Sequence, residues 1–175
     1  MAAQRDSSGN LTHCFKALSR KSVTNLAMLA VSTSLGCAPA VEQAPPVDPA
    51  TLNAAVDTLL SRSEAAWNGG DLEGFLFWYQ RGPETTFLGS TGLTRGWDTI
   101  RARYAPRFEA GATRDSLRFE DLVSRPLAPR LGLATARYVL SRGDSVTASG
   151  VFTLIVEEKS EGWRIVHDHS SADSN

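Results

Sequence analysis

Cysteine is almost absent from this sequence. Of its 175 residues only Cys14 and Cys37 are cysteines, so the 138 residues after Cys37 contain no thiol. Disulfide bonds, cysteine nucleophiles and cysteine-ligated metal sites are therefore excluded from any domain that forms after Cys37. The Walker, dinucleotide-binding and nucleophile-elbow motifs are also missing, and we expect no cofactor.

Positive charge is scarce after Cys37. This part holds thirteen arginines and one lysine against eighteen acidic residues, a formal net charge of −4. Such a domain repels a phosphate backbone, so we expect no nucleic-acid partner. Histidine is scarcer still, since only His167 and His169 follow Cys37.

Residues 20–37 have the features of a bacterial export signal. The stretch RKSVTNLAMLAVSTSLGC has two basic residues, an apolar run too short to span a membrane, and small residues before Cys37. Its SLGC ending resembles a bacterial lipoprotein signal, which implies a leader over residues 1–37 and lipidation of Cys37. An ordinary cleaved secretory signal and a disordered cytoplasmic tail are the alternatives. We expect a lipid-anchored protein of the cell envelope or a secreted one, with the lipid on Cys37 as its only link to a membrane.

Helical signals begin after an Ala/Pro-rich segment, residues 38–47, which is typical of an extended tether. Asp48 followed by Pro49 predicts a helix start, apolar residues recur at helical spacing up to Trp67, and Gly69-Gly70 predicts the end. Asp71 can cap a second, shorter helix over residues 72–80. The sequence next predicts a short strand over residues 85–88, a loop, and a third helix over residues 97–104.

The remaining chain has the pattern of four long strands. They cover residues 116–127, 130–142, 145–159 and 162–171, and Gly143-Asp144 marks the clearest hairpin turn. Strands that follow one another through short turns favour an antiparallel meander. The fold class is therefore α+β, a domain over residues 48–171 with three helices and then four long strands, before a tail over residues 172–175.

Three stretches together resemble a known superfamily. WNGGDLEGFLFWY, LTRGWDTIRARY and GWRIVHDHSS are similar to parts of the cone-shaped fold shared by nuclear transport factor 2, ketosteroid isomerase and the SnoaL-like polyketide cyclases. The last stretch resembles the final strand of a secreted SnoaL-like branch of unknown function. The resemblance implies a cone-shaped barrel, in which a curved antiparallel sheet wraps the N-terminal helix around a mostly apolar pocket, and a homodimer formed through the outer sheet face.

The resemblance does not carry over the catalytic residues of ketosteroid isomerase. The positions that match its oxyanion-hole tyrosine, general base and protonated acid are Ser63, Gly89 and Thr153. None of these side chains can abstract a proton beside a carbonyl or stabilise an enolate in the required way. Fold alone therefore does not choose a function.

The HDH sequence near the C-terminus is the most polar part of the predicted sheet. Side chains alternate along a strand, so His167 and His169 share one face with Trp163 and Ile165, and Asp168 points the other way. If that face is concave, the histidines line the pocket. A metal needs a third ligand such as Glu120 or Asp121, and because no spacing indicates one we assign no metal site.

The predicted pocket residues are those polar side chains that occur within apolar runs: Tyr79, Tyr104, Arg137, His167 and His169. We expect an envelope-tethered or secreted domain that binds a small, largely apolar molecule. One alternative is an isomerase, cyclase or lyase that acts on a hydrophobic carbonyl compound, with His169 or His167 as the catalytic base. Another is a dimeric interaction domain with a vestigial pocket.

Overall fold

The computed structural model describes residues 44–174. The predicted leader over residues 1–37, the predicted lipidation site at Cys37 and most of the predicted tether lie outside the described residues. No helix among residues 44–174 has the length and apolar character needed to cross a membrane.

Helix α1 (Pro49–Gly69) begins and ends where its local signals predict. The Asp48 carboxylate accepts a hydrogen bond of 2.9 Å from the Thr51 backbone N–H and so caps the first turn. The chain leaves the helix through Gly70, whose φ of 79° favours glycine because it has no Cβ.

Helix α2 (Leu72–Leu76) is shorter than the helix predicted over residues 72–80. Asp71 caps it as expected, with 2.9 Å from its carboxylate to the Gly74 N–H. It ends early because the next backbone segment pairs with a strand instead. Ile165 N–H donates to the Trp78 carbonyl at 2.7 Å, and Gln80 N–H donates to the Ile165 carbonyl at 2.8 Å. Because the Trp78 carbonyl and the Gln80 N–H are bonded to Ile165, they are not available for the hydrogen bonds of a longer helix.

A short hairpin, β1 (Thr86–Gly89) and β2 (Gly92–Arg95), replaces the predicted strand and loop. The prediction of a loop after β1 is wrong for residues 92–95, which pair with β1 in the antiparallel sense. Helix α3 (Trp97–Tyr104) follows as predicted and continues into a short 3-10 helix, η1 (Ala105–Phe108), which contains Pro106.

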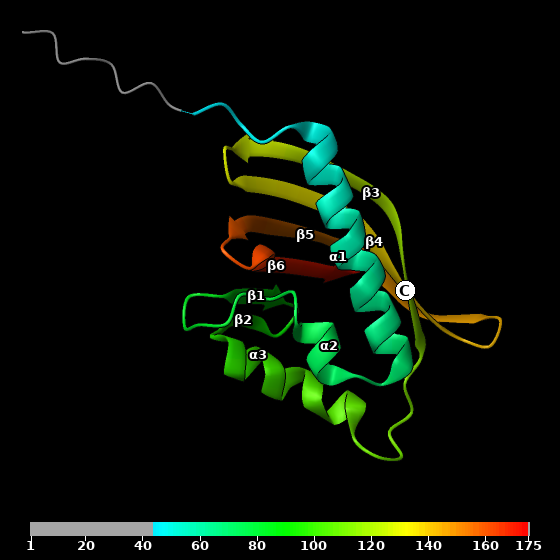
Figure 1. The fold of residues 1–175 in the computed structure, drawn as a ribbon. Coiled ribbons are helices and arrows are strands. Elements are labelled where there is room, and N and C mark those ends of the chain that lie inside the picture. Colours follow the sequence, from blue (N-terminus) through cyan, green and yellow to red (C-terminus); the bar gives the residue numbers. More distant parts are fainter. Residues whose placement is uncertain (1–43, 175) are drawn as a thin grey trace, which may run out of the picture. The chain divides into compact units, whose positions relative to one another are not determined.

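The four predicted long strands are present: β3 (Ser116–Ala128), β4 (Leu131–Arg142), β5 (Ser145–Lys159) and β6 (Gly162–Ala172). They form an antiparallel meander within a six-stranded sheet of order β2-β1-β6-β5-β4-β3. The sheet is mixed rather than wholly antiparallel, because β1 runs parallel to its neighbour β6. The α+β class and the curved sheet packed on the N-terminal helix are confirmed (Figure 1).

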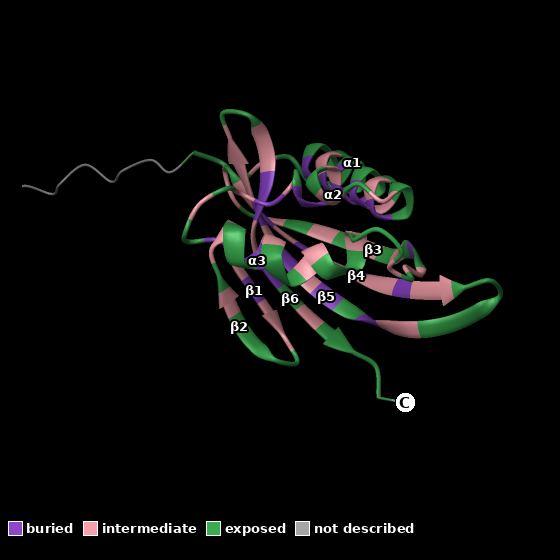
Figure 2. Cartoon of the chain, turned by 90° about the horizontal axis from the view of Figure 1, so that it is seen from below, coloured by how far each residue is buried: buried purple, intermediate pink, exposed green. Residues whose placement is uncertain are grey.

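The core lies between α1 and the face of the sheet that it covers, where the buried residues gather (Figure 2). Leu52, Val56 and Leu59 follow helical spacing and are fully buried. Burying each such side chain contributes about 1.5–3 kcal/mol. This packing holds α1 against the sheet, mainly over β3, and leaves the other end of the same sheet face to the site described next.

Candidate functional site

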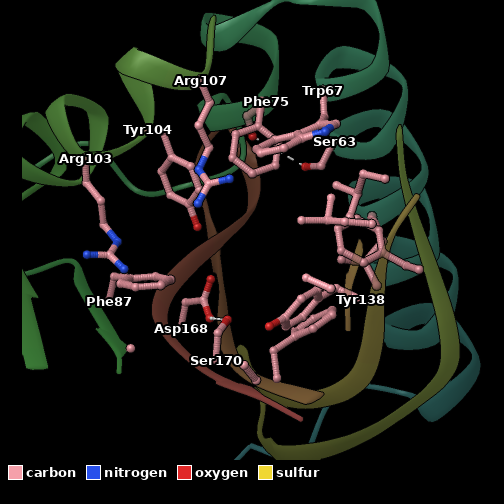
Figure 3. A pocket seen from close by; sticks show the side chains of 18 of the residues that line it. Ser63, Trp67, Phe75, Phe87, Arg103, Tyr104, Arg107, Tyr138, Asp168 and Ser170 are labelled. Carbon is pink, nitrogen blue, oxygen red and sulfur yellow. Dashed lines mark hydrogen bonds between the residues drawn. The ribbon is translucent and has the colours of Figure 1, made fainter. Parts of the chain in front are cut away.

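A cavity of about 590 Å³ lies between the helices and the inner face of the sheet (Figure 3). Aromatic and aliphatic side chains make most of its wall, among them Leu60, Trp67, Phe75, Phe87, Leu117, Phe119, Leu140, Phe152 and Leu154. Several rings pack edge to face, with centroids 5.2 Å apart for Trp67 and Phe75 and 5.0 Å apart for Phe75 and Tyr104. These contacts fix the shape of the cavity and favour an apolar occupant.

Asp168 places a carboxyl group on this apolar wall. It is 5% exposed and comes from β6, where it pairs with Phe87 of β1 on one side and Leu154 of β5 on the other. The Tyr79 hydroxyl donates to one carboxyl oxygen at 2.5 Å, and the Ser170 hydroxyl donates to the other at 2.9 Å. Each oxygen thus keeps the capacity to accept a further hydrogen bond from a ligand.

Burial raises the pKa of Asp168 to about 6, from an ordinary value of 3.8. The hydrogen bonds from Tyr79 and Ser170 and the neighbouring His169 oppose this rise, but they do not outweigh the loss of hydration. The carboxyl group can therefore exchange a proton close to neutral pH, which ordinary surface aspartates do not do.

Two tyrosine hydroxyls accompany this carboxyl group. Burial, followed by the charge of Asp168, raises the pKa values of Tyr79 and Tyr104 well above their ordinary range, so both remain protonated donors. Tyr79 is held in place by the backbone pairing of its segment with Ile165. The Tyr104 hydroxyl points toward Asp168 (Figure 3). The structure thus places both tyrosines predicted for the pocket on the cavity wall.

The prediction that His167 and His169 line the cavity is wrong, since neither is part of its wall. A β-bulge on β6 explains the error. Ile155 pairs with His167 and Val156 pairs with Ile165, so Val166 is an extra residue that reverses the alternation of side chains. Beyond the bulge Asp168 faces the cavity.

The two histidines lie on the opposite side of β6 from the cavity. The His167 ring nitrogen Nδ1 lies 2.7 Å from the Thr86 hydroxyl, and His169 is exposed. Burial, with a contribution from His169, lowers the pKa of His167. A catalytic base for a ligand in the cavity therefore cannot be either histidine.

The prediction that Arg137 reaches the pocket is also wrong. Its guanidinium forms an ion pair with Asp173 and donates to the Ser149 hydroxyl at 3.0 Å, away from the cavity. Its neighbour Tyr138 lines the cavity instead, because adjacent side chains on β4 point to opposite faces of the sheet.

The positions that match the catalytic residues of ketosteroid isomerase do not form a site. Ser63 and Gly89 lie on the cavity wall, and Thr153 does not. Residues 44–174 contain no group of three histidine, cysteine or acidic side chains that could hold a metal ion, so Glu120 and Asp121 do not join the histidines.

Arginine side chains lie at the edge of the cavity. Arg103 donates to the Thr91 hydroxyl at 2.9 Å, and its guanidinium lies 4.8 Å from the centroid of the Phe87 ring. Arg107, from η1, extends beside Tyr104 (Figure 3). Sequence reasoning missed both arginines, as it missed Asp168, because their positions depend on how α3, η1 and β6 pack.

A search of solved structures found the same fold in several bacterial proteins. An NTF-2 like protein of unknown function from Shewanella oneidensis MR-1 is 27% identical, with a TM-score of 0.59 over 70% of this chain and 98% of that chain. A protein of unknown function from the DUF3225 family of Pectobacterium atrosepticum SCRI1043 is 26% identical, with a TM-score of 0.56 over 71% of this chain and 93% of that chain.

An NTF2-like protein of unknown function from Pseudomonas putida KT2440 is 18% identical, with a TM-score of 0.60 over 72% of this chain and 89% of that chain. No family model matched the chain, and no curated protein matched it in sequence. These neighbours agree in fold and carry no stated substrate, so an argument about function has to start from the residues of the cavity.

Proposed function

The described domain has the nuclear transport factor 2-like fold, and we propose that it binds a small, largely apolar molecule in its cavity. The observation that carries this proposal is the apolar-walled cavity of about 590 Å³ around one buried carboxyl group. Its volume lies within the range of about 300–1,000 Å³ that ligand sites occupy, and a few polar groups on an apolar wall are the usual pattern of such sites.

The polar groups suggest how the ligand is oriented. Asp168 can accept a hydrogen bond from a ligand hydroxyl, while Tyr104 can donate one to a ligand carbonyl or hydroxyl oxygen. Tyr138 adds a further hydroxyl on the cavity wall. We therefore expect the inner end of the ligand to carry an uncharged oxygen function.

The vestigial-pocket alternative has less support. A protein whose pocket has lost its role is expected to fill it with side chains, since an empty apolar cavity costs stability. The exposed large apolar side chains of the described residues are also scattered, over the end of α2, β2, β3 and β5: Phe77, Leu93, Val123, Leu127, Val146 and Val151. A homodimer through the outer sheet face remains a proposal that a binding domain would equally allow.

Native mass spectrometry of the full-length chain, purified without denaturation, tests the binding proposal. We expect extra mass that is released on unfolding, and we expect Leu140→Glu to abolish it by placing a charge on the cavity wall. Val151→Glu introduces the same charge at an exposed position outside the cavity and should retain the ligand. Equal retention by both variants would locate binding elsewhere and contradict the proposal.

Acid–base turnover is a second candidate function, favoured by the raised pKa of Asp168. In this reaction the Asp168 carboxylate removes a proton from a carbon beside a ligand carbonyl, and the carbonyl oxygen, as it gains negative charge, accepts a hydrogen bond from Tyr104. The enolate then takes a proton back from Asp168, at the same carbon or at another carbon of the ligand. In deuterium oxide the proton held by Asp168 first exchanges for a deuteron, so the ligand gains deuterium.

Hydrogen–deuterium exchange of β-tetralone in deuterium oxide, followed by proton NMR, tests this second function. Wild-type protein should accelerate the exchange, and Asp168→Asn should lower the rate by at least about a hundredfold, the usual contribution of a general base. His169→Ala is the control and should leave the rate unchanged. A rate that depends on His169 and not on Asp168 would contradict the assignment.

We also propose that the domain acts at the cell envelope, tethered through a lipid on Cys37. The lipoprotein-like residues before Cys37 support this proposal. Metabolic labelling with an alkyne fatty acid should mark the wild-type chain and not a Cys37→Ser variant. Labelling that persists in the variant would contradict lipidation at Cys37.

A further inference from the structure

Arg107 brings a positive charge to the cavity that ligand binding as proposed does not use. Five other arginines of the described residues form ion pairs with carboxylates: Arg81, Arg101, Arg118, Arg137 and Arg142. Within residues 44–174 Arg107 forms no ion pair, although it lies on the cavity wall with Tyr104. A guanidinium is the group best suited to hold a carboxylate through two parallel hydrogen bonds.

Arg103 adds a second positive charge on the same side of the cavity. Its guanidinium is held by the Thr91 hydroxyl and the face of Phe87, so its position is fixed without a carboxylate partner. In Figure 3 the side chains of Arg103 and Arg107 extend from the side of the helices toward the cavity, on either side of Tyr104.

The carboxylate on this part of the wall does not cancel these charges. Asp115 accepts hydrogen bonds from Arg142 at 2.7 Å and from the Thr147 hydroxyl at 2.6 Å. Because Arg142 compensates the charge of Asp115, the region keeps the net positive charge of Arg103 and Arg107. The other carboxyl group that faces the cavity, Asp168, is held by Tyr79 and Ser170 rather than by an arginine.

From this arrangement, and resting on the proposed function, we infer that the ligand is an amphipathic carboxylate. Its apolar body fills the aromatic part of the cavity, and its carboxylate contacts Arg107 and Arg103. Its uncharged oxygen function faces Asp168 and Tyr104. The reverse orientation would place two carboxyl groups against each other in an apolar environment, where like charges repel strongly.

The test compares naphthylacetate with naphthylacetamide, two probes of nearly equal size that differ in charge. Their dissociation constants for the full-length chain are measured by isothermal titration calorimetry at low ionic strength. We expect the carboxylate to bind roughly tenfold more tightly than the amide, because hydrogen bonds to a charged group are stronger than neutral ones. The preference should weaken with added salt, since Arg107 is exposed.

Arg107→Gln should abolish most of this preference, because it weakens binding of the carboxylate much more than binding of the amide. Binding of the amide that persists in this variant shows that the cavity is intact. Arg125→Gln is the matched control, because it removes the same charge from an exposed position of β3 outside the cavity. It should keep the preference of the wild-type chain.

The outcomes separate the two proposals. Equal affinities for both probes in wild-type protein, or a preference that survives Arg107→Gln, overturn the amphipathic carboxylate and leave the binding function standing. If neither probe binds, both the binding function and the amphipathic carboxylate are overturned.

Discussion

Replacing Asp168 with asparagine should stabilise the protein, and increasingly so as the pH rises. The carboxyl group has a pKa of about 6 in the folded state and 3.8 when it is exposed. Between these values the unfolded chain releases the proton while the folded chain still holds it, so the folded state loses stability as the pH increases. An amide at this position never ionises and avoids the loss.

The size of the effect follows from the two pKa values. The difference between the two pKa values lowers the free energy of unfolding by about 1 kcal/mol at pH 4.5 and by about 3 kcal/mol at pH 7, because each pKa unit corresponds to about 1.36 kcal/mol. The asparagine carbonyl can still accept the hydrogen bond from Tyr79. The substitution also changes the hydrogen bond with Ser170, and this change adds a contribution to the free energy of unfolding that does not vary with pH.

Urea unfolding followed by tryptophan fluorescence at several pH values measures this dependence. The free energy of unfolding of Asp168→Asn minus that of wild type should rise by about 2 kcal/mol between pH 4.5 and pH 7. The control is Asp173→Asn. Asp173 is exposed, and its hydrogen bonds with Ser149 and Arg137 lower its pKa. The contribution of this carboxyl group to the free energy of unfolding therefore changes only below pH 3.8, and the effect of Asp173→Asn should be constant between pH 4.5 and pH 7. A constant or falling difference for Asp168→Asn would refute the burial argument for this carboxyl group.

Three further substitutions probe the cavity, the core and the sheet. Tyr79→Phe should raise the pKa of Asp168 further, because it removes a hydrogen bond that stabilises the carboxylate, and a carbon-13 NMR titration of that carboxyl group measures the rise. Leu59→Ala should lower the free energy of unfolding by about 2–5 kcal/mol in urea titrations, since Leu59 is fully buried. Gly150→Ala should lower the midpoint of thermal unfolding, because a Cβ there would lie 2.1 Å from the Ser171 carbonyl oxygen.

Local signals in the sequence were sufficient to predict most elements of this fold. Asp48 and Gly70 bound α1 because a capping carboxylate and a left-handed glycine act on the backbone within a few residues. The four long strands were predicted because alternating side chains and turn residues are also local. The second strand of the short hairpin was missed, since its four residues carry too weak a pattern.

The sequence also led to two of the residues that line the cavity. Tyr79 and Tyr104 occur in apolar segments that have to be buried, and a buried hydroxyl needs a partner. That argument led to the two cavity tyrosines without any knowledge of what surrounds them. Their role in binding a ligand remains a prediction.

Only the tertiary structure decided which side of β6 faces the cavity. Alternation along a regular strand places His167 and His169 together, and the sequence alone favoured these two histidines over Asp168. The bulge at Val166 reverses this order, and it arises from the pairing of β6 with Ile155 and Val156 of β5. Arg107 likewise reaches the cavity only because of the way η1 packs beside it. The sequence by itself determined the elements, whose signals are local, whereas the contacts between distant segments determined which side chains form the site.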